Sequence, residues 1–392
     1  MATVKILSVD DEPAIEVLQR QYFRRKIRSG EYEFFFAHNG LEALAIIGDN
    51  PDIEIILCDI NMPEMDGLTL LAHVNKMQNP ALRVIMVSAY GDMENIRIAM
   101  NNGAFDFATK PIDMDDLSRT IEKAIEQINY VHGAQKEHKQ LESLKKDLTL
   151  ASEIQQYFLP RVFPPFPEDS DKLDIYASME AAKNVGGDFY DFFRIDDDHI
   201  ALVIADVCGK GIPAALFMAV SRMIIRTKGT QGLSAAECMT ESNHLLAAYS
   251  VDYMFVTVFY AIYNTRTGLV NYCNAGHTLP YLLHANGTVE PLPRKMKNPM
   301  VGAIKGVEYK EDSIQLEHGD ILVMYTDGVT EAMNTEGEEM GIGRLEDMLS
   351  HTTGMSSCRQ VIETIKTGIA NFVNGAEQSD DITMLVLTRN EN

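Results

Sequence analysis

At 392 residues the chain is long for one domain, and two or three domains are expected. Its 57 acidic residues outnumber its 34 basic ones, no long segment is basic, and the net charge of −23 argues against nucleic acid as a partner. The chain also has no apolar run long enough to span a bilayer, no signal-peptide pattern and five cysteines without zinc-site spacing, so we expect a cytoplasmic protein with no membrane partner.

Residues 1–125 alternate short aliphatic strands with helices. The expected strands are Val4–Val9, Glu33–Ala37, Ile53–Asp59, Arg83–Ser88 and Phe105–Thr109, and the expected helices are Ile15–Arg25, Leu41–Ile47, Thr69–Met77, Met93–Asn101 and Met114–Asn129. This alternation predicts an α/β domain with a doubly wound five-stranded parallel sheet and helices on both faces. In such a domain, sites lie outside the carboxyl ends of the strands.

Residues 126–160 are predicted to form a helical, coiled-coil-like linker. Mostly apolar residues recur there at spacings of three and four, namely Leu141, Leu144, Leu148, Ala151, Gln155 and Phe158. Such spacing is that of an a/d seam over about two and a half heptads. It fits either a surface helix packed on its own domain or a seam between two chains, and we favour a homodimer through this linker.

Residues 161–392 are dominated by strands. The expected strands are Asp174–Ser178, Phe189–Arg194, His199–Asp206, Tyr253–Tyr263, Val270–Asn274, Leu279–His284, Ser313–Leu316, Asp320–Thr326 and Thr383–Thr388, and the expected helices are Pro213–Lys228, Ala235–Tyr249 and Arg359–Phe372. Strands in hairpin order with a few grouped helices predict a layered α+β domain.

Acidic and polar side chains stand at four strand ends of the first domain. They are Asp10, Asp11, Asp59, Ser88 and Lys110. The carboxyl ends of parallel strands meet at one edge of a sheet, so these side chains should converge. Clustered carboxylates suit Mg²⁺, and one of them can then act as a nucleophile towards a phosphoryl group. The lysine and the hydroxyl would stabilise charge on the transferred oxygens.

The residues after Asp59 make this pattern specific. Met62–Pro63 and Asp66–Gly67 follow it in order, and Pro111 follows Lys110. With these motifs, residues 1–125 resemble the receiver domain of two-component response regulators, which has a flavodoxin-like fold. The resemblance implies that Asp59 is phosphorylated and that a sensor histidine kinase supplies the phosphoryl group.

The same resemblance assigns roles to the side chains around Asp59. It implies an Mg²⁺ site made by Asp10, Asp11, Asp59 and the backbone carbonyl of Asn61. It further implies that Ser88 is the switch hydroxyl, Lys110 the catalytic lysine and Phe107 an aromatic side chain that moves on phosphorylation.

Four acidic motifs beside expected strands mark residues 161–392. They centre on Asp188, Asp206, Asp327 and the Asp380–Asp381 pair, each with glycine or another turn residue nearby. Brought together, these carboxylates would form an oxygen-rich site for two Mg²⁺ or Mn²⁺ ions. A pair of such ions activates water for attack on a phosphoryl group, which predicts a hydrolase.

These motifs resemble those of metal-dependent PPM-type serine/threonine phosphatases, in their bacterial sporulation and stress-response branch, whose fold is a layered β-sandwich. The likeness covers about residues 150–390, including the lead-in Ala151–Pro160. It implies that Asp206 bridges both metals with the Val207 carbonyl as a further ligand, that Asp327 and either Asp380 or Asp381 complete the first metal, and that Asp188 serves the second.

Two further residues match positions of that family, and each has two interpretations. Lys183, just before the Gly-Gly-Asp motif, is either a contact for substrate phosphate or a solvated surface lysine. His277, in the Asn274–His277 motif, either acts directly at the site or belongs to a hairpin turn.

Together the resemblances imply a response regulator whose phosphorylation controls a protein phosphatase. By family resemblance its substrate is a phosphorylated anti-sigma-factor antagonist, and we expect phosphorylation to activate. The alternative is a non-catalytic adaptor, controlled by phosphorylation, that binds an anti-sigma factor or its antagonist. The presence of all four acidic motifs favours the enzyme.

Overall fold

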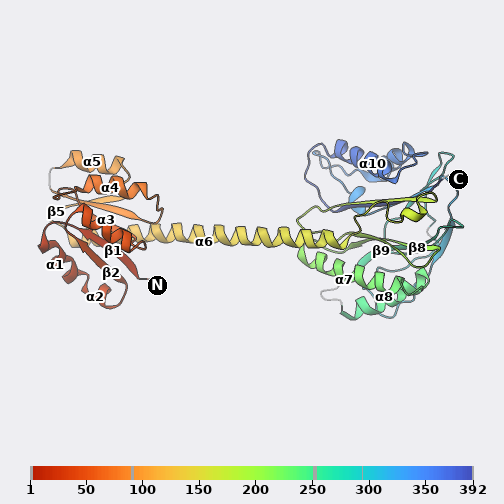
Figure 1. The fold of residues 1–392 in the computed structure, drawn as a ribbon, viewed down its shortest axis with the longest axis horizontal. Helices are drawn as coiled ribbons and strands as arrows, with labels where there is room; N and C mark the ends of the chain where they lie inside the picture. Colours follow the sequence, from red (N-terminus) through yellow and green to blue (C-terminus); the bar gives the residue numbers. More distant parts are fainter. Residues whose placement is uncertain (1–2, 90–91, 250–253, 294, 391–392) are drawn as a thin grey trace. The chain divides into compact units, whose positions relative to one another are not determined.

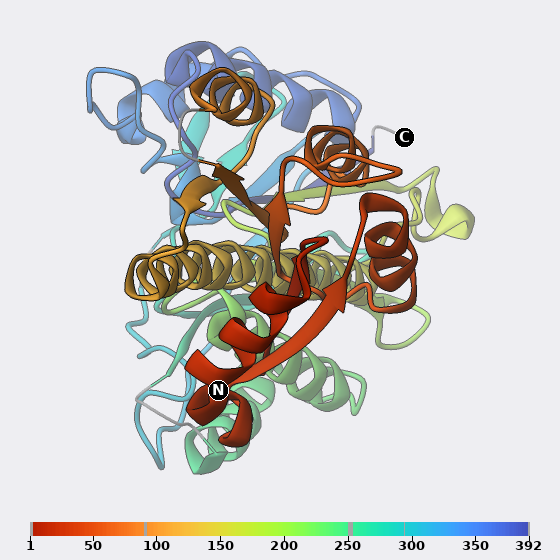
Figure 2. The ribbon, with the colours of Figure 1, turned by 90° about the vertical axis from the view of Figure 1, so that its left-hand side faces the viewer.

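The computed structural model describes residues 3–89, 92–249, 254–293 and 295–390. The chain divides into two compact units, Met1–Leu144 and Lys145–Asn392, and the boundary between them falls inside helix α6 (Met114–Phe158). Figures 1 and 2 show α6 as one unbroken helix. Within the described residues, no helix combines the length and the hydrophobicity needed to cross a bilayer.

The first unit contains a five-stranded parallel sheet in the order β2-β1-β3-β4-β5. Its strands are β1 (Val4–Val9), β2 (Tyr32–Ala37), β3 (Ile55–Asp59), β4 (Arg83–Ala89) and β5 (Asp106–Lys110). Its helices are α1 (Pro13–Tyr22), α2 (Arg24–Arg28), α3 (Gly40–Asp49), α4 (Gly67–Lys76), α5 (Met93–Asn101) and the start of α6. The predicted doubly wound, flavodoxin-like fold is therefore confirmed.

Successive side chains of each strand point to opposite faces of this sheet, and each face has its own hydrophobic core. Ile6 and Leu7 are neighbours in β1 and both are fully buried, yet they belong to different hydrophobic clusters. Ile6 packs in a cluster with Leu117 and Ile121 of α6, whereas Leu7 packs in one with Leu70 of α4. Adjacent side chains of a strand point to opposite faces, so an almost continuous apolar run indicates a sheet covered on both sides.

Two predicted helices have other bounds in the structure. The single helix expected over Ile15–Arg25 is divided at Phe23, a buried residue with φ −85° and ψ 10° that stands between α1 and α2. The helix expected over Met114–Asn129 and the helical linker expected over residues 126–160 form one helix, α6, which ends at Phe158. The residues between Asn129 and Phe158 are mostly strong helix formers, and Pro160 is the first proline after them, so nothing in the local sequence ends the helix earlier.

The second unit contains two antiparallel five-stranded sheets, in the orders β13-β10-β9-β8-β7 and β12-β11-β14-β15-β6. The strands of the first sheet are β7 (Phe189–Arg194), β8 (His199–Val207), β9 (Val256–Asn264), β10 (Leu269–Ala275) and β13 (Asp312–Gln315). Those of the second are β6 (Leu173–Glu180), β11 (Tyr281–Leu283), β12 (Val289–Pro291), β14 (Ile321–Tyr325) and β15 (Ile382–Arg389).

Helices cover the outer faces of both sheets. Helices α7 (Ile212–Gly229) and α8 (Ala235–Tyr249) lie on one side, and α9 (Gly341–Ser350) and α10 (Cys358–Val373) accompany the second sheet. Figures 1 and 2 both show α7 and α8 on the opposite side of the sheets from α10. The predicted layered β-sandwich is confirmed.

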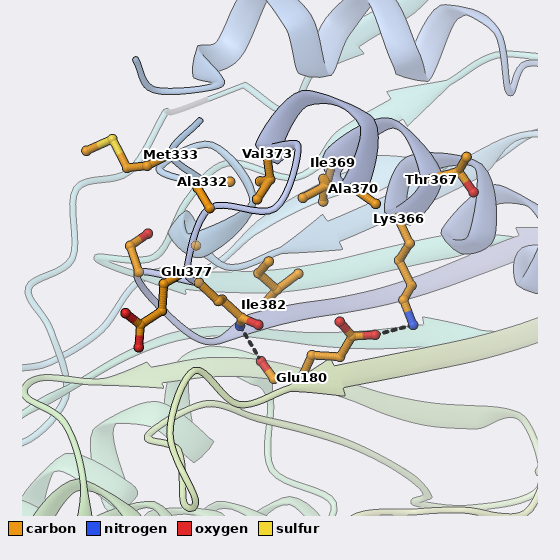
Figure 3. Close-up of a pocket in the computed structure, with 14 residues that line it drawn as sticks. Glu180, Ala332, Met333, Lys366, Thr367, Ile369, Ala370, Val373, Glu377 and Ile382 are labelled. Atoms are coloured by element: carbon orange, nitrogen blue, oxygen red, sulfur yellow. Dashed lines mark hydrogen bonds and ion pairs between the residues drawn. The ribbon is translucent and has the colours of Figure 1, made fainter. Parts of the chain in front are cut away.

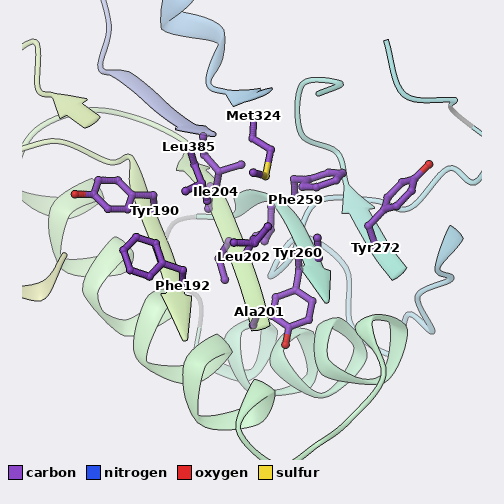
Figure 4. Close-up of a cluster of buried hydrophobic side chains, with 14 of the residues drawn as sticks. Tyr190, Phe192, Ala201, Leu202, Ile204, Phe259, Tyr260, Tyr272, Met324 and Leu385 are labelled. Carbon is purple, nitrogen blue, oxygen red and sulfur yellow. The ribbon is translucent and has the colours of Figure 1, made fainter. Parts of the chain in front are cut away.

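The largest core lies between the two sheets and beneath α7 and α8. Figure 4 shows Ile204 of the first sheet near Met324 and Leu385 of the second, all almost fully buried. The alternate residues Val323 and Tyr325 of β14 belong instead to the cluster that contains α9 and α10. Both faces of the second sheet are therefore buried, which fixes the register of β14 and β15 and thus the acids at their ends.

One predicted strand of this unit has other bounds, and two elements were not predicted. The strand expected over Tyr253–Tyr263 is β9 (Val256–Asn264), and Tyr253 itself lies outside the described residues. Helix α9 and strand β12 were not predicted. The signal for α9 was present, because Leu345 and Leu349, four residues apart, are its buried side chains.

Candidate functional site

The first candidate site lies where β1 and β3 end. Asp10 and Asp11 follow β1 directly, and Asp59 is the last residue of β3. One carboxylate oxygen from each lies within 4.8 Å of the others. Asp10 and Asp59 are buried and Asp11 is exposed. Three carboxylates at this spacing suit a hard divalent cation with oxygen ligands.

Lys110, at the end of β5, compensates much of this negative charge. Its Nζ lies 2.7 Å from Asp59 Oδ2, 2.9 Å from Glu12 Oε1 and 3.0 Å from Asp10 Oδ2. Burial alone would lower the pKa of Lys110, but hydrogen bonds to Asp59, Glu12 and Asp10 outweigh it and raise the pKa. Glu12 was not predicted, although it follows Asp11 directly in the sequence.

Ser88 and Phe107 lie on β4 and β5, and Ser88 directly follows Val87, which is paired with Asp59. The Ser88 hydroxyl, buried in β4, donates a hydrogen bond of 3.4 Å to Asp92. Phe107, in β5, is 36% exposed. The backbone N–H of Asn61 lies 3.4 Å from Asp59 Oδ1. The structure thus brings together the three acids and Lys110, while the hydrogen bond of the Ser88 hydroxyl goes to Asp92.

The second candidate site lies in the second unit, where four acids meet from different strands. Asp188 precedes β7, Asp206 lies near the end of β8, Asp327 follows β14 and Asp380 precedes β15. Burial raises the pKa of Asp206 to about 7, and repulsion from Asp327 and Asp380 adds to this shift. Burial, followed by repulsion from Asp206, also raises the pKa of Asp188.

The carboxylates therefore belong to one electrostatic cluster, although among the described residues it is the acids of the receiver, and not these, that bring three oxygens within 4.8 Å of one another. Burial raises the pKa of Asp327 as well, and Asp380 contributes to the shift. A divalent cation among these oxygens would remove the repulsion, so the residues present fit a metal centre. The predicted acids are therefore brought together, although they are separated by up to 192 positions in the chain from Asp188 to Asp380.

Two neighbours fix the orientation of Asp188. Thr326, which is buried just before Asp327, donates a hydrogen bond of 2.7 Å from its hydroxyl to Asp188 Oδ2. A Cβ at Gly187 would lie only 3.0 Å from the Val207 carbonyl oxygen, so glycine permits this close approach. The role of Thr326 was not predicted.

The carboxylates of Asp380 and Asp381 have different surroundings. Asp381 accepts backbone hydrogen bonds from Ala182 (2.8 Å), Gly187 (2.7 Å) and Asp188 (3.4 Å). Asp380 instead pairs with Lys210, at 2.9 Å between Oδ2 and Nζ. Asp381 thus holds the loop that carries Asp188, whereas Asp380, which among the described residues has no such backbone contacts with that loop, interacts with Asp206 and Asp327.

Lys210 is a second feature that was missed from the sequence. It lies between Gly209 and Gly211, whose φ angles of 89° and 80° form a turn that other residues rarely adopt. Its Nζ also donates to the Ser379 carbonyl at 2.7 Å. The hydrogen bond with Asp380 raises the pKa of Lys210. Its position four residues after Asp206 was the available signal.

His277 is a buried link between the two sheets. Its Nδ1 lies 2.8 Å from the Thr257 hydroxyl, and its Nε2 lies 3.1 Å from the Tyr325 carbonyl, to which it donates. Burial lowers the pKa of His277 to about 4, so the ring is neutral near pH 7. Lys183, in contrast, is exposed in the loop before β7.

The last turn of α6 contacts the loop that carries Asp188. Gln155 is buried; its Nε2 donates to the Gly186 carbonyl at 2.6 Å, and its Oε1 accepts from the Gly186 N–H at 3.0 Å. Gln155 was predicted to belong to an apolar seam, and that assignment is wrong. Leu141 and Leu144 of the predicted seam are exposed.

Comparison with known proteins assigns both units to families. The response regulator receiver domain model matches residues 6–122, and the model for stage II sporulation protein E matches residues 196–390. The class of protein that fold and site define is thus a receiver joined to a phosphatase. The chain is a response regulator with an N-terminal receiver domain and a C-terminal PPM-type phosphatase domain of the SpoIIE family.

Two proteins and one solved structure illustrate the similarity. Protein IcfG of Synechocystis is 32% identical over 271 residues, which is 62% of this chain but only 42% of IcfG. The phosphoserine phosphatase RsbU of Bacillus subtilis is 29% identical over 280 residues, covering 70% of this chain and 81% of RsbU. The SiaA-PP2C domain of Pseudomonas aeruginosa shares the fold, with a TM-score of 0.55 at 20% identity over 64% of this chain and 98% of that domain.

Proposed function

We propose that phosphorylation of Asp59 controls a metal-dependent phosphoserine or phosphothreonine phosphatase in the same chain. Residues 1–125 act as the receiver, 126–160 as the linker and 161–392 as the enzyme. The observation that carries the proposal is that Asp188, Asp206, Asp327 and Asp380 come from the ends of four different strands into one site. Burial, followed by repulsion from Asp327 and Asp380, raises the pKa of Asp206 to about 7. The likeness to the phosphoserine phosphatase RsbU supports the reaction type.

The acids would hold two Mn²⁺ or Mg²⁺ ions, with Asp206 shared between them. Asp327 and Asp380 would complete the first site, Asp188 would serve the second, and the Val207 carbonyl would add a ligand. We assign Asp380 rather than Asp381, because the Asp381 oxygens already accept backbone hydrogen bonds. When bound, such ions supply a nucleophilic water and stabilise charge on the phosphoryl group.

The surrounding residues orient these acids and meet the substrate. Thr326 keeps Asp188 in one orientation through its hydroxyl. Lys210 offsets part of the negative charge at Asp380 and presents an ammonium group at the edge of the site. Lys183, exposed beside the loop of Asp188, is placed to attract a phosphate group. His277 acts at a distance, by joining the two sheets.

In the receiver, an Asp59 carboxylate oxygen is the nucleophile that accepts the phosphoryl group from a sensor histidine kinase. Asp10, Asp11, Asp59 and the Asn61 carbonyl would hold Mg²⁺, whose charge assists the transfer. Lys110, 2.7 Å from Asp59, is placed to contact the new phosphoryl oxygens. Ser88 would then turn from Asp92 towards the phosphoryl group, and Phe107 would move inward.

The substrate we propose is a phosphorylated anti-sigma-factor antagonist, whose dephosphorylation releases a sigma factor. This assignment rests on the resemblance to the sporulation and stress-response phosphatases. We further propose that the chain forms a homodimer through the linker and that phosphorylation of Asp59 activates hydrolysis.

Hydrolysis of p-nitrophenyl phosphate tests the enzyme. The wild-type protein should turn over this substrate only with Mn²⁺ or Mg²⁺. Asp206→Asn and Asp327→Asn should abolish turnover, because an amide supplies no charge to hold the cation. Asp171→Asn, at an exposed acid, is the control. Retained turnover in Asp206→Asn would reject the assigned site, and an inactive wild-type protein would favour the adaptor.

Labelling with acetyl phosphate tests the receiver. The wild-type protein should become phosphorylated in the presence of Mg²⁺, and Asp59→Asn should not, because an amide is a poor nucleophile. Asp52→Asn, at an exposed acid after α3, should be labelled normally. Mg²⁺-dependent labelling that persists in Asp59→Asn would identify a different acceptor.

A further inference from the structure

A pocket of about 430 Å³ opens in the phosphatase domain between the second half of α10 and the start of β15 (Figure 3). Apolar side chains form much of its wall, among them Ala332, Ile369, Val373 and Ile382. Its size is within the usual range of ligand pockets, roughly 300–1,000 Å³. None of the roles proposed above uses this pocket.

The pocket shares its wall with the metal-binding acids. Gly328, which follows Asp327, and Ser379, which precedes Asp380, both line it. A Cβ at Gly328 would lie 3.4 Å from the Cβ of Asp380, so the two segments are in contact. The pocket therefore adjoins the segments that carry Asp327 and Asp380, beside any polypeptide whose phosphate is bound at these acids.

The charges around the pocket opening favour a ligand with a basic group next to the part that enters the pocket. Lys366 is paired with Glu180, and Figure 3 shows this pair at one side of the pocket. Glu377 lies on the other side and is exposed. Because the lysine is neutralised by Glu180, the carboxylate of Glu377 leaves the opening net negative.

We propose that this pocket binds an apolar side chain of the phosphoprotein substrate, close in sequence to the phosphorylated residue, with a basic side chain of the same segment against Glu377. The inference rests on the proposed phosphatase function and adds to it the class of sequence that the enzyme selects. An apolar wall contributes affinity by removing the side chain from water, and the acidic rim contributes specificity.

Two neighbouring positions of α10 allow a matched pair of variants. Ala370 is exposed and lines the pocket, so Ala370→Phe should fill it without disturbing the core. Asn371 is also exposed but lines the groove between α9 and α10 instead. Asn371→Phe therefore adds the same ring to the same helix and leaves the pocket open.

Short phosphoserine peptides provide the substrate. The parent peptides have alanine around the phosphoserine. In one series a single leucine, with one lysine beside it, replaces alanine at each of these positions in turn. The wild-type protein and Asn371→Phe should prefer leucine at one position by about tenfold in kcat/KM, and Ala370→Phe should lose the preference. All three should hydrolyse p-nitrophenyl phosphate equally. A wild-type protein without positional preference, or a preference that survives in Ala370→Phe, would overturn the proposal.

A binding measurement separates the pocket from the catalytic function. Fluorescent peptides of the same series are titrated with the protein in EDTA and followed by anisotropy, which needs no turnover. Leucine-dependent binding that is lost in Ala370→Phe supports the proposed pocket, whether or not hydrolysis is observed. If neither the peptides nor p-nitrophenyl phosphate is hydrolysed, the proposed phosphatase function alone fails. Hydrolysis of p-nitrophenyl phosphate without leucine-dependent binding overturns the pocket alone.

Discussion

His277 illustrates how much of a residue's role depends on its tertiary contacts. From the sequence it was either a direct participant at the site or part of a hairpin turn. Its ring instead joins Thr257 of the first sheet to the Tyr325 carbonyl of the second. No local pattern identifies that link, because its two partners lie 20 positions before and 48 positions after it in the chain.

The buried ring predicts a specific pH dependence. The pKa of His277 is about 4 in the folded protein, and that of an unfolded histidine is about 6.5. Above the unfolded pKa, His277 is neutral in both the folded and the unfolded protein, so its full contribution to the free energy of unfolding is present. As the pH falls from 6.5 towards 4, the unfolded state binds the proton first, so stability is lost.

We therefore expect the stability difference between the wild-type protein and His277→Asn to shrink with falling pH. Between about pH 7.5 and pH 5 the difference in the free energy of unfolding should narrow by about 2 kcal/mol, because the variant lacks this group. Urea unfolding of the full chain measures it. His138→Asn, at an exposed histidine of α6, is the control. A difference that does not change with pH would contradict the buried neutral ring.

Among the helices and strands, those whose apolar periodicity matches their burial in the fold could be predicted from the sequence. The five parallel strands of the receiver were recognised from their aliphatic runs, and Asp10, Asp59 and Lys110 followed from where those strands end. Gln155 was misassigned because spacings of three and four are common to a dimer seam and to a helix packed on its own domain. The polar side chain of Gln155 at an otherwise apolar seam position was the signal that favoured a helix packed on its own domain over a dimer seam.

The contact between α6 and Gly186 leads to a prediction about metal binding. Gln155→Leu would leave the buried N–H and carbonyl of Gly186 without partners, which costs about 1–3 kcal/mol for each group. The loop that carries Asp188 should then lose its fixed conformation, so the affinity for Mn²⁺ should fall several-fold and hydrolysis should fall with it.

Titration calorimetry with Mn²⁺ measures this effect. Gln156→Leu is the matched control, because Gln156 is exposed one position further along the same helix. If Gln155→Leu binds Mn²⁺ as tightly as the wild-type protein, the end of α6 packs on the phosphatase domain without influencing its acids.

For the whole molecule, α6 is the element that both units have in common. It begins after β5, which carries Phe107 and Lys110, and ends three residues after Gln155. A phosphoryl group on Asp59 adds negative charge and acceptor oxygens beside Lys110. It can change hydrolysis only as far as it stabilises one packing state of α6 more than another.

Two leucines of α6 are the residues through which such states would differ. Leu144 is 53% exposed and Leu148, four residues further on, is half-buried, so each has surface available to a second chain. We expect the wild-type protein to form dimers by sedimentation and to hydrolyse p-nitrophenyl phosphate faster after treatment with acetyl phosphate. The double variant Leu144→Ala/Leu148→Ala should still be labelled at Asp59 and keep its basal hydrolysis, but its rate of hydrolysis should no longer respond to phosphorylation.

The control is the double variant Gln140→Ala/Lys146→Ala, at exposed polar positions of the same helix, whose hydrolysis should respond normally to phosphorylation. A normal response in the leucine variant would show that α6 tethers the domains without transmitting the signal.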